Sequence, residues 1–278
     1  MWREVVEVCL LALVVLLPIL WKCSSTFRYY VKIIAYYGDV LLTGLIACLV
    51  LWPNGRTHEN MRRLIKIGKF LTRKYGVRVV VRGREHMATD GPSVIIANHQ
   101  SALDILVCLE AWPHPCVVMA KRSLSYAGPF GLAAYLCGSV FVDRFNPAKA
   151  RQQMQHIGDY IKEAQCKLWM YPEGTRNREV GMLPFKKGAF HIAVEAQIPI
   201  VPVVCSSYDF FYCKKSRRFL PDGLIIAEAL PAIQTKGLSA DNVAALAEEA
   251  REKMLSVYHR INPEAKTMFL ESVKQKSA

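Results

Sequence analysis

The sequence lacks the short motifs and paired cysteines that identify many common classes of enzyme and metalloprotein. It has no GxSxG, P-loop, GxGxxG or HExxH motif, which argues against a serine hydrolase, the common nucleotide-binding folds and a zincin. Its 9 cysteines are odd in number and scattered, and they include no CxxC pair. We therefore expect neither a disulfide framework nor a metal site, and we predict free thiols in a reducing, cytosol-facing environment.

Long hydrophobic runs are missing beyond the first 55 residues, so any membrane segment is expected before that point. Residues 5–21 form an apolar run interrupted only by Glu7, and acidic residues occupy the start, where a signal peptide would be basic. This pattern favours a retained anchor. Residues 31–52 form a second apolar run, which is less suited to a simple span because two charged residues interrupt it.

Acidic residues are also scarce, because 23 Asp and Glu stand against 36 Lys and Arg, for a net charge of +13. Basic residues follow both apolar runs and crowd the segment 61–90. Two simple spans would leave one of these basic groups on the wrong side of the membrane. We therefore predict one span plus an interfacial helix, or a shallow two-helix hairpin, with the globular domain facing the cytosol.

A second basic cluster lies at residues 214–218. Such clusters are commonly just solvated surface, but they also favour anionic lipid, phosphorylated substrates or nucleic acid. Next to a hydrophobic anchor, membrane lipid is the preferred partner, and we expect no nucleic acid. Residues 274–278 match the KxKxx pattern of dilysine retrieval signals, which predicts the membrane of the endoplasmic reticulum.

Short apolar segments alternate with helical ones in the remainder of the chain. Strands are expected at residues 77–81, 93–97, 116–120, 139–142, 167–171, 200–205 and 224–228, and helices at residues 101–111, 147–164, 187–196 and 241–260. This alternation predicts an α/β fold, a layered domain with a mainly parallel central sheet flanked by helices and preceded by N-terminal hydrophobic membrane helices. The predicted units are a membrane anchor at 1–55, a globular domain at 56–262 and a cytosolic tail at 263–278.

Residues 56–75 have the pattern of an amphipathic helix, with apolar residues at helical spacing and basic residues between them. Two placements follow from this pattern. The helix either lies along the membrane as a basic collar or packs on the core of the domain.

The first chemical motif, residues 97–104, directly follows an apolar strand. His99 falls in the predicted strand-to-helix turn, and Asp104 falls in the first turn of the next helix. A carboxylate on one ring nitrogen fixes the tautomer and leaves the other nitrogen free to accept a proton, which would make His99 a general base. The alternative is that Ser101 and Asp104 form a capping box and His99 is a passive turn residue.

Cationic residues follow three other predicted strands. Arg176 ends the motif YPEGTR, Arg144 ends GSVFVDR, and Lys121 ends the strand at 116–120. Each could be structural, and Glu173 with Arg176 could form only a surface salt bridge. Because the ends of parallel strands meet at one edge of a sheet, the fold is expected to bring these cations to the histidine. Arginine can bind a phosphate with two hydrogen bonds.

A base without a nucleophile, beside phosphate-binding cations, is suited to one kind of chemistry. A substrate hydroxyl can attack an acyl group that is already activated. A thioester is such an acyl donor, because its thiolate leaves readily and neither a metal nor a covalent intermediate is required.

These motifs resemble the conserved blocks of the glycerolipid acyltransferase family. NHQSALD (98–104), GSVFVDR (138–144), YPEGTRN (171–177) and IPIVPVV (198–204) correspond to its four blocks in order. The wider run from Glu173 to Tyr208 is similar to the animal 1-acyl-sn-glycerol-3-phosphate (lysophosphatidic acid) acyltransferases. The likeness covers residues 60–261. It departs from the family at Tyr171, where Phe is usual, which affects only local packing.

The resemblance implies transfer of a fatty acyl group from acyl-CoA to the sn-2 hydroxyl of lysophosphatidic acid, giving phosphatidic acid, with no cofactor. It implies that His99 is the base and Asp104 its partner. It further implies a substrate site in which Arg176, Lys121 and Arg144 hold the phosphate, Glu173 and Gly174 shape the pocket, and Thr175 also binds substrate. The alternatives are a different lysophospholipid acceptor or a non-catalytic lipid-binding scaffold.

Overall fold

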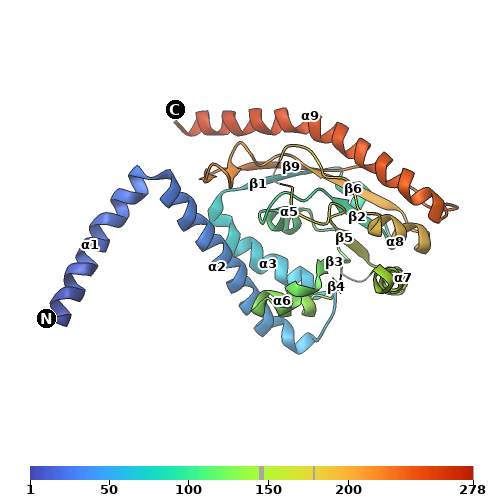
Figure 1. The fold of residues 1–278 in the computed structure, drawn as a ribbon, viewed down its shortest axis with the longest axis horizontal. Coiled ribbons are helices and arrows are strands. Elements are labelled where there is room, and N and C mark those ends of the chain that lie inside the picture. The colour runs from blue at the N-terminus through green and yellow to red at the C-terminus, as the bar shows by residue number, and fades with distance from the viewer. Residues whose placement is uncertain (144–146, 178, 278) are drawn as a thin grey trace.

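A seven-stranded sheet organises the computed structural model, which describes residues 1–143, 147–177 and 179–277 (Figure 1). Its strands in spatial order are β1 (Arg78–Arg82), β9 (Leu224–Ala229), β6 (Ile200–Cys205), β2 (Val94–Ala97), β5 (Lys167–Met170), β3 (Cys116–Lys121) and β4 (Val140–Val142). The strands from β6 to β4 are parallel, whereas β1 and β9 are parallel to each other and antiparallel to the rest. The prediction of a mainly parallel sheet is confirmed, and each strand lies within one residue of its predicted position.

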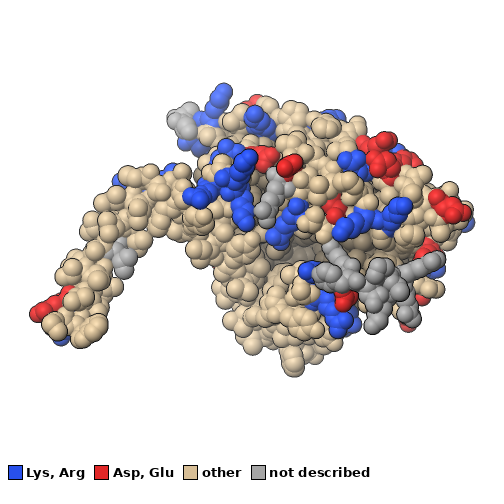
Figure 2. Space-filling model, viewed as in Figure 1, with Lys and Arg blue, Asp and Glu red and all other residues tan. Residues whose placement is uncertain are grey.

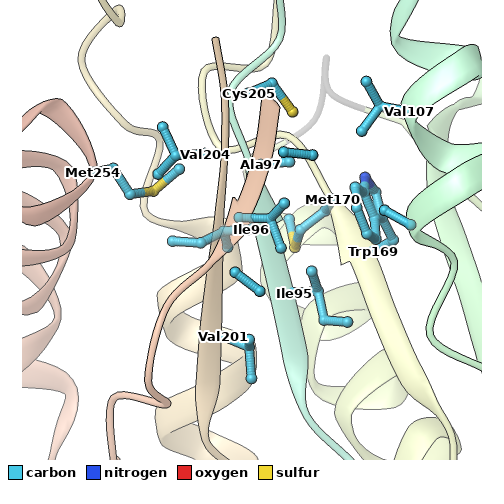
Figure 3. Packing of buried hydrophobic residues seen from close by; sticks show 14 of the residues in the cluster. Ile95, Ile96, Ala97, Val107, Trp169, Met170, Val201, Val204, Cys205 and Met254 are labelled. Carbon is cyan, nitrogen blue, oxygen red and sulfur yellow. The ribbon is translucent and has the colours of Figure 1, made fainter. Parts of the chain in front are cut away.

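The centre of the sheet is apolar on both faces. Every residue of β2, β5 and β6 is buried, as expected for parallel strands that have helices on both sides. Figure 3 shows how Ile95, Trp169 and Val201 from these strands pack together in the core. This rigid centre places the carboxyl ends of β2 and β5 next to each other.

Helices cover both faces of the sheet (Figure 1). On one face, α7 (Pro147–Glu163), α8 (Gly188–Ala196) and α9 (Val243–Ser277) pack in succession. On the other face, α5 (Asp104–Ala111) packs beneath α3 (Asn60–Thr72). The predicted amphipathic helix is α3, and it packs against the domain, with Met61 and Gly68 buried and its basic residues largely exposed.

Several elements differ from the sequence-based prediction. The helix expected at 101–111 begins only at Asp104, because the preceding residues form a turn. The helix expected to end at residue 260 continues as α9 to Ser277, through the segment predicted as a tail. Its extension is stabilised by Ala265 and Phe269, which are buried against the core. The helix α6 (Gly128–Leu136) and the two-stranded ribbon of β7 (Tyr212–Cys213) and β8 (Arg218–Phe219) were not predicted.

The two N-terminal helices, α1 (Trp2–Cys23) and α2 (Ser25–Leu51), are both long and apolar enough to cross a membrane. All described side chains of α1 are exposed, and the helix projects away from the domain (Figure 1). In contrast, one side of α2 packs on α3 and α6. A Cβ atom on Gly44 would lie 2.9 Å from the backbone of Phe130, so the glycine allows α2 and α6 to approach closely. Thus α2 forms part of the domain, whereas α1 does not.

Candidate active site

His99 and Asp104 meet at the carboxyl end of β2. The strand ends at Ala97, residues 98–103 form a turn, and Asp104 is the first residue of α5. Nδ1 of His99 lies 2.5 Å from Oδ2 of Asp104. The His99 side chain is 21% exposed and that of Asp104 is 5% exposed, so the carboxylate is buried while the imidazole reaches open space.

The carboxylate of Asp104 also accepts hydrogen bonds from the backbone of this turn. The donors are Gln100 N at 2.9 Å and Ser101 N at 3.2 Å. The capping box proposed from sequence is not formed, because the N-cap of α5 is Leu103 and the Ser101 hydroxyl accepts from Leu103 N at 3.0 Å. The histidine–carboxylate pair is present, and the carboxylate braces the turn before the helix. Because these bonds fix the carboxylate, it can keep a proton on Nδ1 of His99 and leave Nε2 as the acceptor.

The ring of Tyr171 stacks on His99, with the ring centroids 4.2 Å apart and the planes at 22°. The Tyr171 hydroxyl shares a hydrogen bond of 3.3 Å with Sγ of Cys108. Burial raises the pKa of Tyr171 well above its usual value and raises the pKa of Cys108 to about 12. Both groups are therefore protonated near neutral pH, and Cys108 is not a thiolate nucleophile.

The YPEGTRN loop holds both backbone groups of His99. Oε1 of Glu173 accepts a hydrogen bond from His99 N at 2.7 Å, and Asn177 N donates to His99 O at 2.7 Å. The other carboxylate oxygen of Glu173 accepts from Leu183 N at 2.9 Å. Burial raises the pKa of Glu173, although the two backbone donors oppose that shift. Glu173 is only 2% exposed and positions His99 from within the protein.

The alternative of a surface salt bridge between Glu173 and Arg176 is wrong: Glu173 is buried with its two oxygens on backbone donors, and no ion pair joins these two described residues. Gly174 has a φ of +69°, and a Cβ atom there would lie 2.8 Å from the Lys186 side chain. The side chain of Lys186, a cation that the sequence analysis did not select, therefore lies close to this loop. The turn aims the exposed side chains of Thr175 and Arg176 away from the core.

A cavity of about 640 Å³ brings together most of the residues that the sequence analysis singled out. At one end it is lined by His99, Asp104, Lys121, Gly174, Thr175 and Arg176. The predicted site residue Arg144 lies outside the described residues. Glu173 does not line the cavity, and its contacts are with the backbone that shapes it.

Most of the remaining lining of this cavity is apolar, and much of it comes from four helices that are distant in sequence. Among its lining residues are Val40 from α2, Leu64 from α3, Leu109 from α5 and Ala134 from α6. The cavity therefore has a polar end at the histidine and an apolar body beneath α2, α3 and α6. The sequence analysis did not predict the apolar body of the cavity, because the amphipathic pattern of α3 was the only local sign of it.

Two amide side chains that were not selected from sequence attach the turn at residues 98–103 to β6 and the residue after it. Asn98 donates to Cys205 O at 2.9 Å and accepts from Cys205 N at 2.7 Å. Gln100 donates to Ser206 O at 2.9 Å. The sequence did contain a sign of these contacts. Both amides come soon after a buried strand, and a buried amide needs hydrogen-bond partners.

Two tyrosines complete the surroundings of the turn. Tyr36 of α2 donates to Ala102 O at 2.8 Å, which fastens α2 to the turn that carries His99. Tyr208 is 3% exposed, and burial, followed by the charge of Asp104, raises the pKa of its hydroxyl. Among the described residues, no group of three His, Cys, Asp or Glu side chains is placed to hold a metal ion.

Comparison with known proteins relates this site to acyl transfer. Residues 78–206 match the family model described as Acyltransferase. The chain is 43% identical to human 1-acyl-sn-glycerol-3-phosphate acyltransferase alpha over 251 residues, covering 90% of this chain and 88% of that protein. It is 39% identical to the human beta protein over 256 residues, covering 91% and 92% of the two chains.

The fold is also similar to a solved structure. The crystal structure of the 1-acyl-sn-glycerophosphate (LPA) acyltransferase PlsC from Thermotoga maritima superposes with a TM-score of 0.61. The match covers 84% of this chain and 96% of that chain at 21% sequence identity. At this level of identity the similarity supports the fold, including the arrangement of the sheet and its helices.

Proposed function

The chain belongs to the 1-acyl-sn-glycerol-3-phosphate acyltransferase family, and from that premise we propose that it transfers an acyl group from acyl-CoA to the sn-2 hydroxyl of lysophosphatidic acid. One observation carries the proposal. The imidazole of His99, paired with Asp104, lies where the polar end of the cavity meets its apolar body. A lipid with a charged head and a fatty chain requires such a junction at the reacting atom.

In the proposed reaction, Nε2 of His99 takes the proton of the acceptor hydroxyl as its oxygen attacks the thioester carbonyl. A carbon–oxygen bond forms, the carbon–sulfur bond breaks, and the leaving thiolate takes the proton back from the imidazole. Asp104 stabilises the imidazolium that exists between these steps. No cofactor takes part in this scheme, because the thioester is activated before it binds.

We assign the phosphate of the acceptor to the cations at the polar end of the cavity. Arg176 and Lys121 both line this end. A phosphomonoester carries close to two negative charges near neutral pH, so more than one cation suits it. The side chain of Arg144 is assigned to the same role from the sequence alone.

We assign the apolar body of the cavity to the fatty chain of the acyl donor. The reacting carbonyl is the end of that chain, so a cavity that begins at His99 and continues between α2, α3 and α6 follows the direction the chain must take. Its volume of about 640 Å³ falls within the range of roughly 300–1,000 Å³ typical of ligand pockets.

Narrowing this cavity is expected to shorten the acyl chains that the protein accepts. Ala134 lines the cavity, so Ala134→Phe places a ring in the space assigned to the chain. The variant should lose about tenfold or more in activity with long-chain acyl-CoA, while shorter chains are affected less. The control is Leu132→Phe on the same helix, where the side chain is exposed and does not line the cavity. An equal loss for all chain lengths would contradict the assignment.

The experiment that tests the proposed function measures transfer of labelled acyl groups by the purified protein to a panel of lysophospholipids. We expect lysophosphatidic acid to be the preferred acceptor, because the phosphate end carries cations and a choline headgroup would be repelled. Preference for lysophosphatidylcholine would overturn the acceptor. No transfer to any acceptor would favour a lipid-binding scaffold.

We further propose that the protein lies in the membrane of the endoplasmic reticulum with its catalytic domain in the cytosol. The support is the exposed basic surface of α3, directly after the apolar helix α2, because positive charge is retained on the cytosolic side. Protease added to sealed microsomes should remove a tag placed after Ala278. Protection of that tag would reverse the orientation.

A further inference from the structure

The ribbon of β7 and β8 ends in a strongly basic turn that the proposed reaction does not use. The four cations of this basic turn are Lys214, Lys215, Arg217 and Arg218, and all are exposed. Within the described part of the chain, none of them forms an ion pair with a carboxylate. Figure 2 shows Lys and Arg gathered where this ribbon meets α2. Four like charges without acidic partners repel one another, and an anionic partner would relieve this repulsion.

The basic turn is fixed to the first half of α2. Nζ of Lys32 donates to Phe219 O at 2.9 Å and lies 5.6 Å from the centre of the Phe219 ring. The guanidinium of Arg217 lies 5.7 Å from the centre of the Tyr30 ring. Arg217 also has a φ of +49°, an uncommon conformation for a residue other than glycine. These contacts define the position of the turn relative to the apolar helix.

The adjoining part of the two N-terminal helices combines apolar and basic groups. Arg28 donates to Trp21 O at 2.6 Å and to Lys22 O at 2.9 Å, which fastens the corner between α1 and α2. Tyr30 is 47% exposed and Ile34 is 70% exposed on the outer side of α2. Exposed apolar residues on a helix, with aromatic and basic groups beside them, are the pattern of a segment at a membrane–water interface.

We propose that the basic turn binds the phosphates of anionic phospholipid headgroups in the membrane that holds α1 and α2. The apolar helices set the depth of the protein, and the turn sets its tilt by contacting the charged surface beside α2. This inference goes beyond the proposed function, because it concerns how the domain sits on the membrane and does not depend on which reaction it catalyses.

The test uses the full-length protein in lipid nanodiscs and the protease trypsin, which cleaves after Lys and Arg. One set of discs contains phosphatidylcholine alone, and the other contains equal parts of phosphatidylcholine and phosphatidylserine. The rate of cleavage at residues 214–218 should fall roughly tenfold in the anionic discs and should recover at high salt. Lys236, in an exposed turn between β9 and α9, serves as the internal control and should be cleaved equally in both discs. Equal cleavage of the basic turn in both discs would overturn the proposal.

A charge-reversed variant distinguishes the phosphates of membrane lipids from those of coenzyme A as the ligand of the basic turn. K214E/K215E should make cleavage at Arg217 and Arg218 independent of lipid composition, while the apparent KM for acyl-CoA in neutral discs stays unchanged. If the variant instead raises this KM several-fold in neutral and anionic discs alike, the turn binds the phosphates of coenzyme A and the membrane proposal is wrong. The cleavage experiment requires no enzymatic activity, so its outcome is separate from that of the acyl-transfer assay.

Discussion

Replacing His99 with alanine is expected to reduce acyl transfer by about 10²–10⁴-fold, the usual contribution of a general base. The imidazole is held by Asp104 at 2.5 Å and by the stacked ring of Tyr171, so alanine removes the proton acceptor and leaves its supports in place. Asp104→Asn should also lower kcat severely, because an amide that donates to Nδ1 would favour the wrong tautomer. The measurement is kcat with labelled acyl-CoA in the full-length protein.

The matched control is His114→Ala. His114 forms another histidine–carboxylate pair, with Nε2 3.0 Å from Oε1 of Glu59, but it does not line the cavity. Its loss should leave kcat within about twofold of the parent protein, because it lacks access to substrate. Circular dichroism and membrane extraction establish that the variants fold. Near-normal turnover in a folded His99→Ala protein would remove His99 from the mechanism.

Replacing Arg176 with alanine is expected to raise the apparent KM for lysophosphatidic acid by roughly ten- to a hundredfold. The reason is the loss of a charge-assisted contact to the phosphate, which contributes about 1.5–3 kcal/mol. The effect on the KM for acyl-CoA should be smaller, because the residue is assigned to the acceptor. Arg176→Lys should restore only part of the affinity, since an ammonium cannot form the paired hydrogen bonds of a guanidinium.

Arg122→Ala separates this role from a general effect of charge. Arg122 is exposed in the segment directly after β3, close in sequence to the cavity residue Lys121, but it does not line the cavity. Its removal changes the net charge by the same amount as Arg176→Ala. Equal increases in KM for the two variants would show that the effect is long-range attraction, and the assigned phosphate contact would have to be abandoned.

The strands were predictable because each is built around a short apolar run, and the three at the centre of the sheet, β2, β5 and β6, are buried completely. The helices were less predictable where local pattern and tertiary packing disagree. Pro263 suggests the end of a helix, because a proline disfavours helical conformation in the residue before it. Buried Ala265 and Phe269 outweigh this preference and carry α9 onward. The segment that forms α6 contains glycine and proline and is apolar without a helical period, so sequence alone gave little sign of it.

The polar end of the site was predictable for a different reason. His99 and the YPEGTR motif closely follow the ends of β2 and β5, Asp104 begins the next helix, and the ends of neighbouring parallel strands must meet. The apolar body of the cavity was not predictable, because α2, α3 and α6 contribute its wall from separate parts of the chain. The function of Glu173 was also hidden, because its partners are backbone groups of His99 and Leu183.

The contact between Tyr36 and the backbone of Ala102 has a consequence for how the N-terminal region can change during evolution. A helix that only anchors a protein can accept almost any apolar sequence, and α1 has this freedom because its described side chains touch little of the domain. In α2 the inner side, with Tyr36 and Gly44, is constrained by the turn that carries His99 and by α6. Selection should therefore act on one side of α2 as it acts on an enzyme core, and exchanging this helix for an unrelated anchor should inactivate the protein.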